Sequence, residues 1–200
     1  MTNNYAIQAL SKNDLAQATE ICAEAMLDNP LHIKVFGTDT RLRARRLKRF
    51  FPGMLTYIQR KDSLYGVFAG GCLIGVLGML PPKRCKPSLA DSLRLLPTLL
   101  GSNSPIGTLR LAIWLTTWAN IDPATPHWHL GPLAVAPAWQ RQGIGSRLLE
   151  YACSKGNDDS LYLETDKLSN VELYQRFGFT TLAAPTILGC ISWVMLRHPS

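Results

Sequence analysis

The segment that most constrains the fold of this chain runs from Leu133 to Cys153 and reads LAVAPAWQRQGIGSRLLEYAC. A short apolar stretch leads into a polar arm, then Gly143 and Gly145, and then apolar residues at helical spacing. The first amides of a helix have no partner within it, and the positive end of its dipole attracts an anion. Glycines let that anion approach the backbone without obstruction by side chains. The segment therefore predicts a strand, a loop that binds a phosphate or pyrophosphate, and a helix.

Glycines before a helix also occur in Walker loops, in dinucleotide-binding loops and in ordinary turns. A Walker loop is excluded because it needs a Gly-Lys pair, and no lysine stands here. A dinucleotide loop needs a third glycine where Leu148 stands, yet Glu164 lies at the end of the next strand, where such a fold places an acid. An ordinary turn with glycines for tight packing is the purely structural alternative. The dinucleotide and packing interpretations stay open at this point.

The order of the remaining segments indicates one domain over residues 1–200, because 46% hydrophobic content in this length suffices for one core. Strand and helix patterns alternate, which indicates an α/β or α+β architecture around a mixed sheet. We expect a helical insertion at about 82–126, since a structureless loop of that length is rare inside a compact domain. The other expected elements are helices at about 11–29, 40–59, 142–155 and 170–177, a hairpin at 63–80, and strands at 127–137, 160–165, 180–185 and 189–198.

The chain carries a formal charge of +7, and six of the nine residues at 41–49 are basic. An apolar stripe beside them favours a solvated helix face, although a cofactor with several phosphates would also suit the charge. No nucleic-acid partner is expected, because no aromatic-interleaved or zinc-finger pattern accompanies it. The five scattered cysteines, the short apolar segments and the absence of a signal-like start predict a cytoplasmic protein without membrane association.

Residues 133–152 resemble the acetyl-CoA-binding signature of the GNAT superfamily of N-acetyltransferases. The family pattern is Arg or Gln, two residues, Gly, one residue, then Gly or Ala, and residues 140–145 match it. Gly143 follows Val135 by eight positions, as in the family, and the downstream LYLETDKLSNVELYQRFGF resembles the family's next strand and helix. The resemblance implies a single GNAT-like domain with a mixed, mostly antiparallel sheet that splays at its fourth main strand and carries helices on both faces.

The resemblance also implies a set of residues that bind acetyl-CoA. Backbone amides of the glycine loop would surround the pyrophosphate, strand main-chain groups would meet the pantetheine and the thioester, and an asparagine would contact the cofactor's arm. In this sequence the implied residues are Leu133, Val135, Gln140, Arg141, Gln142, Gly143, Ile144, Gly145, Ser146 and Asn170.

Two side chains are candidate catalytic residues. Tyr174 stands at the family's general-acid position, and a phenol can protonate a departing thiolate; a packed tyrosine is the alternative. His129 stands six residues before Val135, where histone-modifying members place a general-base Glu. Strand alternation predicts that His129 and Val135 share a face, and an ordinary pKa of about 6.5 suits a base near neutrality; a structural histidine is the alternative.

Neighbouring polar residues have weaker expected roles. His127 and His129 form a His-x-His pair, but no third ligand stands at a recognisable spacing, so no metal site is expected. His127 is instead a candidate for relaying a proton to solvent. Glu164 is a candidate for orienting a substrate amine, whereas Glu150 is expected to face solvent.

Together these features predict an acetyl-CoA-dependent N-acetyltransferase that acts on a primary amine by direct attack in a ternary complex. A non-catalytic acyl-CoA-binding sensor or scaffold, and a dinucleotide-binding oxidoreductase, are the alternatives. The acceptor is expected to be a small-molecule or peptide amine, in a subgroup similar to puromycin acetyltransferase. Pairing of two chains through the C-terminal strands to form a homodimer is left open.

Overall fold

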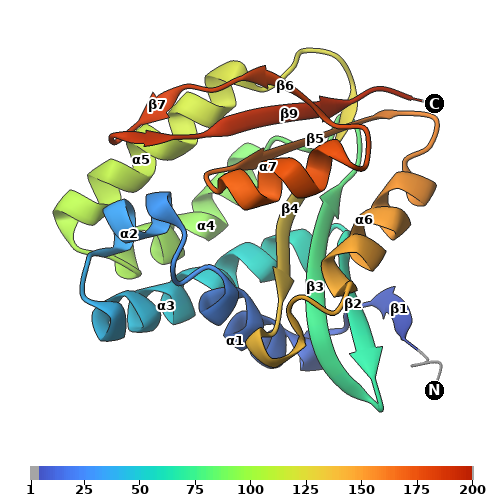
Figure 1. The fold of residues 1–200 in the computed structure, drawn as a ribbon. Coiled ribbons are helices and arrows are strands. Elements are labelled where there is room, and N and C mark those ends of the chain that lie inside the picture. Colours follow the sequence, from blue (N-terminus) through green and yellow to red (C-terminus); the bar gives the residue numbers. More distant parts are fainter. Residues whose placement is uncertain (1–4, 200) are drawn as a thin grey trace.

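A computed structural model describes residues 5–199 of the chain. The predicted helices and strands are present in the predicted order, with some shifted ends, but β1 and α2 were not predicted from the sequence (Figure 1). The main strands are β1 (Ala6–Ala9), β2 (Leu64–Ala69), β3 (Cys72–Leu80), β4 (His127–Val135), β5 (Ser160–Thr165), β6 (Thr180–Ala183) and β9 (Trp193–Arg197). The helices are α1 (Leu15–Ala25), α2 (Pro30–Phe36), α3 (Thr40–Gln59), α4 (Leu89–Gly101), α5 (Pro105–Ile121), α6 (Ile144–Lys155) and α7 (Leu168–Gln175).

Within residues 5–199 these strands form a seven-stranded sheet in the order β1-β2-β3-β4-β5-β9-β6. All neighbouring pairs are antiparallel except β4 and β5, which run parallel. The β4–β5 pairing covers only residues 127–129 and 160–162, after which the two strands diverge (Figure 1). The expected mixed, mostly antiparallel sheet that splays at the fourth main strand is thereby confirmed.

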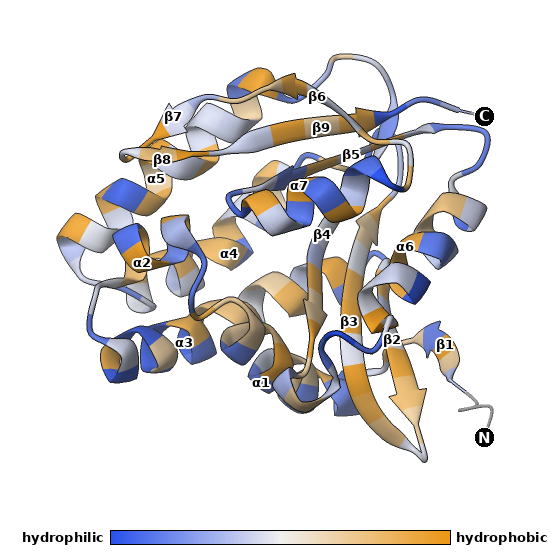
Figure 2. Ribbon diagram, viewed as in Figure 1, coloured by the Kyte–Doolittle hydropathy of each residue, from blue (hydrophilic) through white to orange (hydrophobic). Residues whose placement is uncertain are grey.

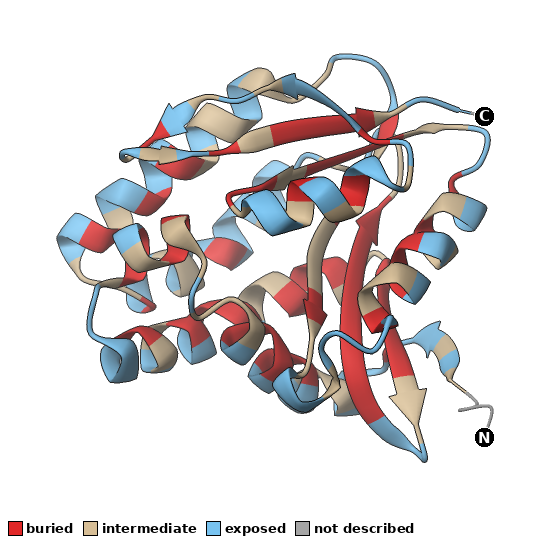
Figure 3. Ribbon diagram, viewed as in Figure 1, coloured by how far each residue is buried: buried red, intermediate tan, exposed pale blue. Residues whose placement is uncertain are grey.

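Two cores lie on opposite faces of the sheet. Helices α1 to α5 pack on one face, where Val76, Leu80 and Ala134 belong to their core. Helices α6 and α7 pack on the other face, where Leu77 and Leu130 belong to the second core. Figures 2 and 3 show that the central strands carry apolar and buried residues, while the outer surfaces of the helices are largely exposed. On α4 and α5 these outer surfaces include exposed apolar side chains such as Leu93 and Leu109. This division assigns every site residue below to one face or the other.

Several local predictions hold to within a residue or two. The α3 helix covers residues 40–59 despite Pro52 in its interior, and β2 and β3 form the expected hairpin through Gly70 and Gly71. Residues 82–126 fold into α4 and α5, as expected of a helical segment between two strands. The expected strand over 189–198 is wrong in one respect: it breaks at Ser192, whose N–H donates to the Pro185 carbonyl. The part before the break forms β8 (Cys190–Ile191), which pairs with β7 (Thr186–Ile187) in a separate small hairpin.

A bulge interrupts β4 at Gly131 and Pro132. Leu130 pairs with Met79 and Leu133 pairs with Leu77, so three steps along β4 match two along β3. An extra residue in one strand reverses which face its side chains occupy. Odd-numbered residues of β4 therefore direct their side chains to one face of the sheet before the bulge and to the other face after it.

In the described part of the chain, none of the helices combines the length and the apolar composition required to cross a bilayer.

Candidate active site

The divergence of β4 from β5 leaves one edge of β4 without a strand partner. The N–H of Ala136 donates to the carbonyl of Ile74, a residue of β3, at 2.9 Å. Ala136 and every second residue before it, back to the bulge, therefore direct their main-chain N–H and C=O groups toward β3. Main-chain direction alternates along a strand. Leu133 and Val135 therefore direct their amide and carbonyl groups toward the open edge, where an extended ligand can complete the hydrogen bonding. Of these groups, the Val135 carbonyl accepts a bond of 3.1 Å from the Gln140 side chain.

The glycine loop at the start of α6 presents a row of free amides. The first backbone bond of α6 runs from the Arg147 N–H to the Gly143 carbonyl at 3.0 Å. Within residues 5–199, no hydrogen bond engages the amides of residues 142–146. Arg141 adds a positive charge at the loop, with a left-handed φ of 59°. Converging amides at a helix N-terminus suit a phosphate or pyrophosphate.

The structure also shows whether tight packing between elements requires the two glycines of this loop. Gly143 caps α6 with a φ of 80°, which disfavours any side chain, and a Cβ there would meet nothing within 4 Å. A Cβ at Gly145 would come no closer than 3.9 Å to its nearest neighbours, Leu133 and Leu173. Neither glycine is required by a tight contact between elements, so the packing interpretation is wrong. The space in front of both glycines is open to a ligand.

His129 forms a close pair with Glu164 across the two diverging strands. Its Nε2 donates to Oε2 of Glu164 at 3.0 Å, and the glutamate side chain is only 4% exposed. Burial alone would lower the pKa of His129, but the charge and the hydrogen bond of Glu164, together with the charge of Asp122, outweigh it and raise that pKa. Glu164 thus contacts the candidate base directly, and its expected role in orienting a substrate amine stays a prediction.

The expectation that His129 shares a face with Val135 is wrong. Leu133 and Val135 pack against the core under α6 and α7. His129 pairs with Leu80, which belongs to the core of the other face, and its ring contacts Tyr162 on that same side with centroids 5.1 Å apart. The bulge at Gly131 and Pro132 is the reason, because it reverses the alternation between the two positions. His129 thus lies on the α1–α5 face, opposite the glycine loop.

A second polar pair adjoins the first. His127 also contacts the ring of Tyr162, with centroids 5.0 Å apart, so the two histidines share a face as expected. Its Nδ1 donates to the Thr125 carbonyl at 2.8 Å, and its Nε2 lies 3.0 Å from Oδ1 of Asp122. Asp122 was not predicted from the sequence, although it stands five residues before His127, because the end of α5 has to turn back onto the sheet to bring it there.

Tyr174 and Asn170 lie on α7, on the face that carries the glycine loop. Tyr174 is 7% exposed and packs near Phe179, with ring centroids 5.9 Å apart. Burial raises its pKa, and the nearby Asp166 carboxylate adds to this effect. Asn170 donates to the Thr165 hydroxyl at 3.1 Å, which fixes its side chain at the end of β5. Both residues lie on the side of the sheet where a ligand of the glycine loop would be found.

Two polar contacts hold the α1–α2 turn and the start of α2 against the residues that follow β5. Asp166, just after β5, accepts the N–H of Leu31 at 2.6 Å, and Lys167 pairs with Asp28 at the same distance. Burial of Asp166 raises the pKa of its carboxyl, although the bond from Leu31 opposes this effect. Asp166 was not predicted from the sequence either, because nothing local indicates its contact with residues more than a hundred positions earlier.

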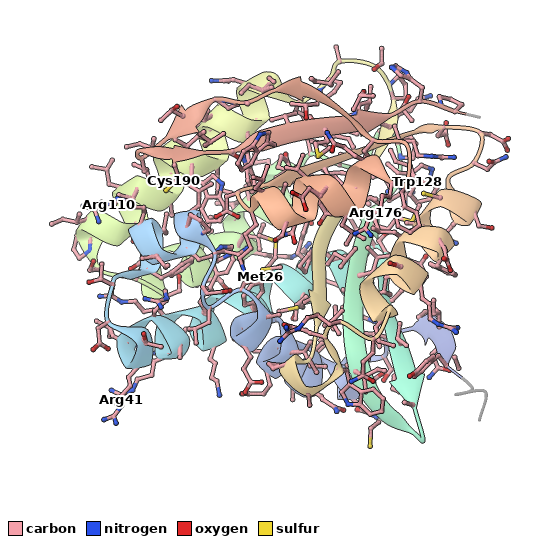
Figure 4. The ribbon with its side chains drawn as sticks, viewed as in Figure 1. Met26, Arg41, Arg110, Trp128, Arg176 and Cys190 are labelled. Carbon is pink, nitrogen blue, oxygen red and sulfur yellow. The ribbon has the colours of Figure 1, made fainter. Side chains whose placement is uncertain are left out.

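The basic helix α3 lies far from the glycine loop in the fold. It packs against α1 and α4 on the face opposite α6. Figure 4 shows Arg41 on α3 and Arg110 on α5 projecting outward at the side of the molecule away from α6. The interpretation of residues 41–49 as a solvated helix face holds for the exposed basic residues Arg41, Arg45, Lys48 and Arg49. It is wrong for Arg43, which is buried and donates to the carbonyls of Leu27, Gly37 and Thr38. The position of α3 away from α6 does not support the suggestion that this segment attracts the phosphates of a cofactor at the glycine loop.

The sequence profile of the acetyltransferase (GNAT) family matches residues 37–179, more than half of the chain. The chain belongs to the GNAT family. It is therefore an acyltransferase of a family whose members use acetyl-CoA and act on amines. A doubly wound dinucleotide-binding sheet, the alternative for the glycine loop, is excluded because β4 and β5 are the only parallel pair among the strands of residues 5–199.

Solved structures share this GNAT fold over nearly the whole chain. A Corynebacterium glutamicum protein described as histone acetyltransferase HPA2 and related acetyltransferase has a TM-score of 0.73 at 19% identity, covering 98% of this chain and 97% of its own. Arylalkylamine N-acetyltransferase 2 from Aedes aegypti has a TM-score of 0.60 at 14% identity, covering 99% and 100%. The ribosomal-protein-S18-alanine N-acetyltransferase from Escherichia coli has a TM-score of 0.56 at 16% identity, covering 98% and 94%. No curated protein matches the sequence.

Proposed function

We propose that this GNAT protein transfers the acetyl group of acetyl-CoA to a primary amine, by direct attack while both substrates are bound. The observation that carries the proposal is the combination of the free amides of residues 142–146, the open β4 edge and the His129–Glu164 pair, in which the glutamate side chain is buried and the histidine is half-buried. The first two features suit a long phosphorylated cofactor, and the third supplies acid-base chemistry.

The cofactor side consists of groups on the α6–α7 face and along the edge of β4. Amides of residues 142–146 bind the pyrophosphate, and Arg141 contributes charge beside it. Main-chain groups of Leu133 and Val135 hold the extended arm, and Asn170 contacts it. When bound, acetyl-CoA supplies an activated thioester carbonyl, and the Val135 N–H is placed to stabilise charge that develops on its oxygen.

On the amine side, the chain must remove a proton before attack. Nε2 of His129 is held by Glu164, so Nδ1 is the nitrogen left to accept the proton from the amine. Glu164 fixes the orientation of the ring and stabilises the charge that His129 then acquires. Because His129 lies on the α1–α5 face, we place the acceptor there, beside the turn between α1 and α2. The two carboxylates, Glu164 and Asp122, favour an acceptor that arrives as an ammonium ion.

Tyr174 completes the reaction as the general acid. Its raised pKa keeps the phenol protonated across the neutral range, so it remains a donor until a thiolate departs. Tyr174 and His129 lie on opposite faces of the sheet, which lets one group deprotonate the amine while the other protonates the thiol.

The acceptor we propose is a small-molecule or peptide amine. The related structures include an enzyme named for arylalkylamines and one named for a ribosomal protein alanine, so the shared fold accommodates both classes. A sensor or scaffold that only binds acyl-CoA would not need a histidine paired with a buried carboxylate beside the open edge, and this pair favours the enzyme.

Calorimetric titration with acetyl-CoA tests the proposal, with NAD as the control ligand. We expect one acetyl-CoA per chain and no binding of NAD. Gly143→Ala, which introduces a side chain at a left-handed position in the loop, is expected to weaken acetyl-CoA binding about tenfold or more. Gly101→Ala at the end of α4, where a Cβ also meets nothing, is the matched control and should bind normally.

A second assay tests catalysis itself. Release of free CoA thiol should accompany loss of primary amine when a panel of arylalkylamines, polyamines and peptide N-termini is offered. Tight acetyl-CoA binding without thiol release from any amine would favour the sensor, and a folded protein that binds no acetyl-CoA would overturn the whole proposal.

A further inference from the structure

Asp122, His127 and His129 form a cluster, here called the Asp-His-His cluster, at the junction of α5 with β4. One ring nitrogen of each histidine and one carboxylate oxygen of Asp122 lie within 4.8 Å of one another. The sequence offered the His-x-His pair without a third ligand; the fold brings Asp122 to it.

Two buried atoms in this cluster face each other without a hydrogen bond. Nε2 of His127 and Oδ1 of Asp122 approach to 3.0 Å, but neither has a hydrogen-bond partner in the described chain. The side chains are 4% and 8% exposed, so bulk water does not satisfy them. The Nδ1 of His127 already donates to Thr125, so Nε2 can donate to Asp122 only when the ring carries a second proton. A metal ion coordinated by both atoms satisfies them without that proton.

The surroundings resemble the outer shell of a metal site. Metal-binding histidines commonly donate their second ring nitrogen to a carbonyl or carboxylate, which fixes the ring. His127 does so to the Thr125 carbonyl and His129 does so to Glu164, at 2.8 and 3.0 Å. As metal ligands the two imidazoles are neutral, so together with the carboxylates of Asp122 and Glu164 they give the site two negative charges, which a divalent ion neutralises. The competing cation is Lys86, 3.4 Å from the other oxygen of Asp122, but its side chain is 69% exposed and free to swing away.

We propose that the Asp-His-His cluster binds one divalent first-row metal ion, with zinc as the best match to two imidazoles and a carboxylate. Three protein ligands leave a coordination position for water or an incoming ligand. The bound ion occupies the lone pair of His129 that the amine reaction needs, so zinc is an inhibitor of transfer. This consequence rests on the proposed function, whereas the site itself does not.

Calorimetric titration of zinc chloride into EDTA-stripped, tag-free protein tests the site. We expect one ion per chain, and we expect Asp122→Asn and His127→Gln each to weaken binding at least about tenfold. The controls are His198→Gln, a histidine outside the cluster, and Cys72→Ser, an exposed thiol, and both should bind as the unaltered chain does. Circular dichroism verifies that each variant is folded.

Cobalt substitution provides a measurement that needs no variant. We expect visible absorption bands of a four- or five-coordinate cobalt ion with nitrogen and oxygen ligands, which zinc abolishes by displacement. Absence of both zinc binding and these bands in the unaltered chain overturns the proposal, as does zinc binding that survives Asp122→Asn but disappears in Cys72→Ser. Metal binding by a protein that acetylates no amine, even when stripped, would support the site and contradict the proposed function instead.

Discussion

At the scale of single residues, the proposed chemistry depends on two side chains that the sheet separates. Tyr174, the proposed general acid, lies on the α7 side, and we expect Tyr174→Phe to lower kcat about 100-fold, because general acid catalysis typically contributes that much or more. The KM for acetyl-CoA should change little, since the aromatic ring still packs against Phe179. Steady-state kinetics with thiol detection measures both constants, and normal turnover in a folded variant would remove Tyr174 from the acid role.

His129, the proposed base, lies on the opposite side, and its pKa should determine how the activity depends on pH. The neutral ring is the active form of the base, and Glu164 raises the pKa of His129 above its ordinary value. The plot of activity against pH should therefore have a rising limb whose midpoint lies above about pH 6.5. In Glu164→Gln the limb should move to lower pH while the maximal rate falls, because the charge is lost and the ring is less well oriented. Glu150→Gln on the exposed surface of α6 should leave the profile unchanged; a limb that does not move in Glu164→Gln would contradict the pairing.

The His129–Glu164 pair should also contribute to the free energy of unfolding, by an amount that changes with pH in a definite direction. A histidine whose folded-state pKa is raised stabilises the fold at low pH, and that contribution is lost as pH rises through the raised value. Chemical unfolding at pH values on either side of the limb should show this loss in the unaltered chain and a smaller one in Glu164→Gln.

At the scale of elements, the bulge in β4 decides which face each side chain occupies. Gly78 on β3 lies against the bulge, and a Cβ there would collide with the Gly131 carbonyl. We expect Gly78→Ala to displace the bulge, to lower the free energy of unfolding by about 1–3 kcal/mol, and to abolish most of the transfer activity. Thermal and denaturant unfolding with activity at a temperature where the variant is folded measure these effects. Full activity would mean that the position of the bulge does not matter.

At the scale of the whole molecule, the sheet keeps the basic helix away from the glycine loop. We expect the double substitution Arg45→Glu and Arg49→Glu to change the KM for acetyl-CoA by less than about twofold, because charges beyond a Debye length of about 8 Å are largely screened. Arg141→Ala, at the loop itself, should raise this KM clearly. An equal effect of both changes would indicate that α3 contributes to cofactor binding.

Whether a feature of this molecule can be predicted from the sequence depends on how far apart along the chain its interacting residues lie. The glycine loop is predictable because its amides and their direction depend on a few consecutive residues. The splayed sheet and the family follow from two motifs in order. The face of His129 is not predictable, since alternation fails at a bulge that depends on pairing with β3. The contacts of Glu164, Asp122 and Asp166 require segments distant in sequence to meet, and no local pattern reports them.

The reversed alternation in β4 has a consequence for how such an enzyme can change. Groups assigned to the cofactor lie on the side of α6 and α7 or along the strand edge, whereas the proposed base lies on the side of α1 to α5, where we also expect the acceptor. Substitutions in α1, α2, α4 and α5 can therefore redirect the choice of amine while recognition of the acyl donor is retained. A variant library confined to those helices should yield new acceptor specificities at nearly constant acetyl-CoA affinity.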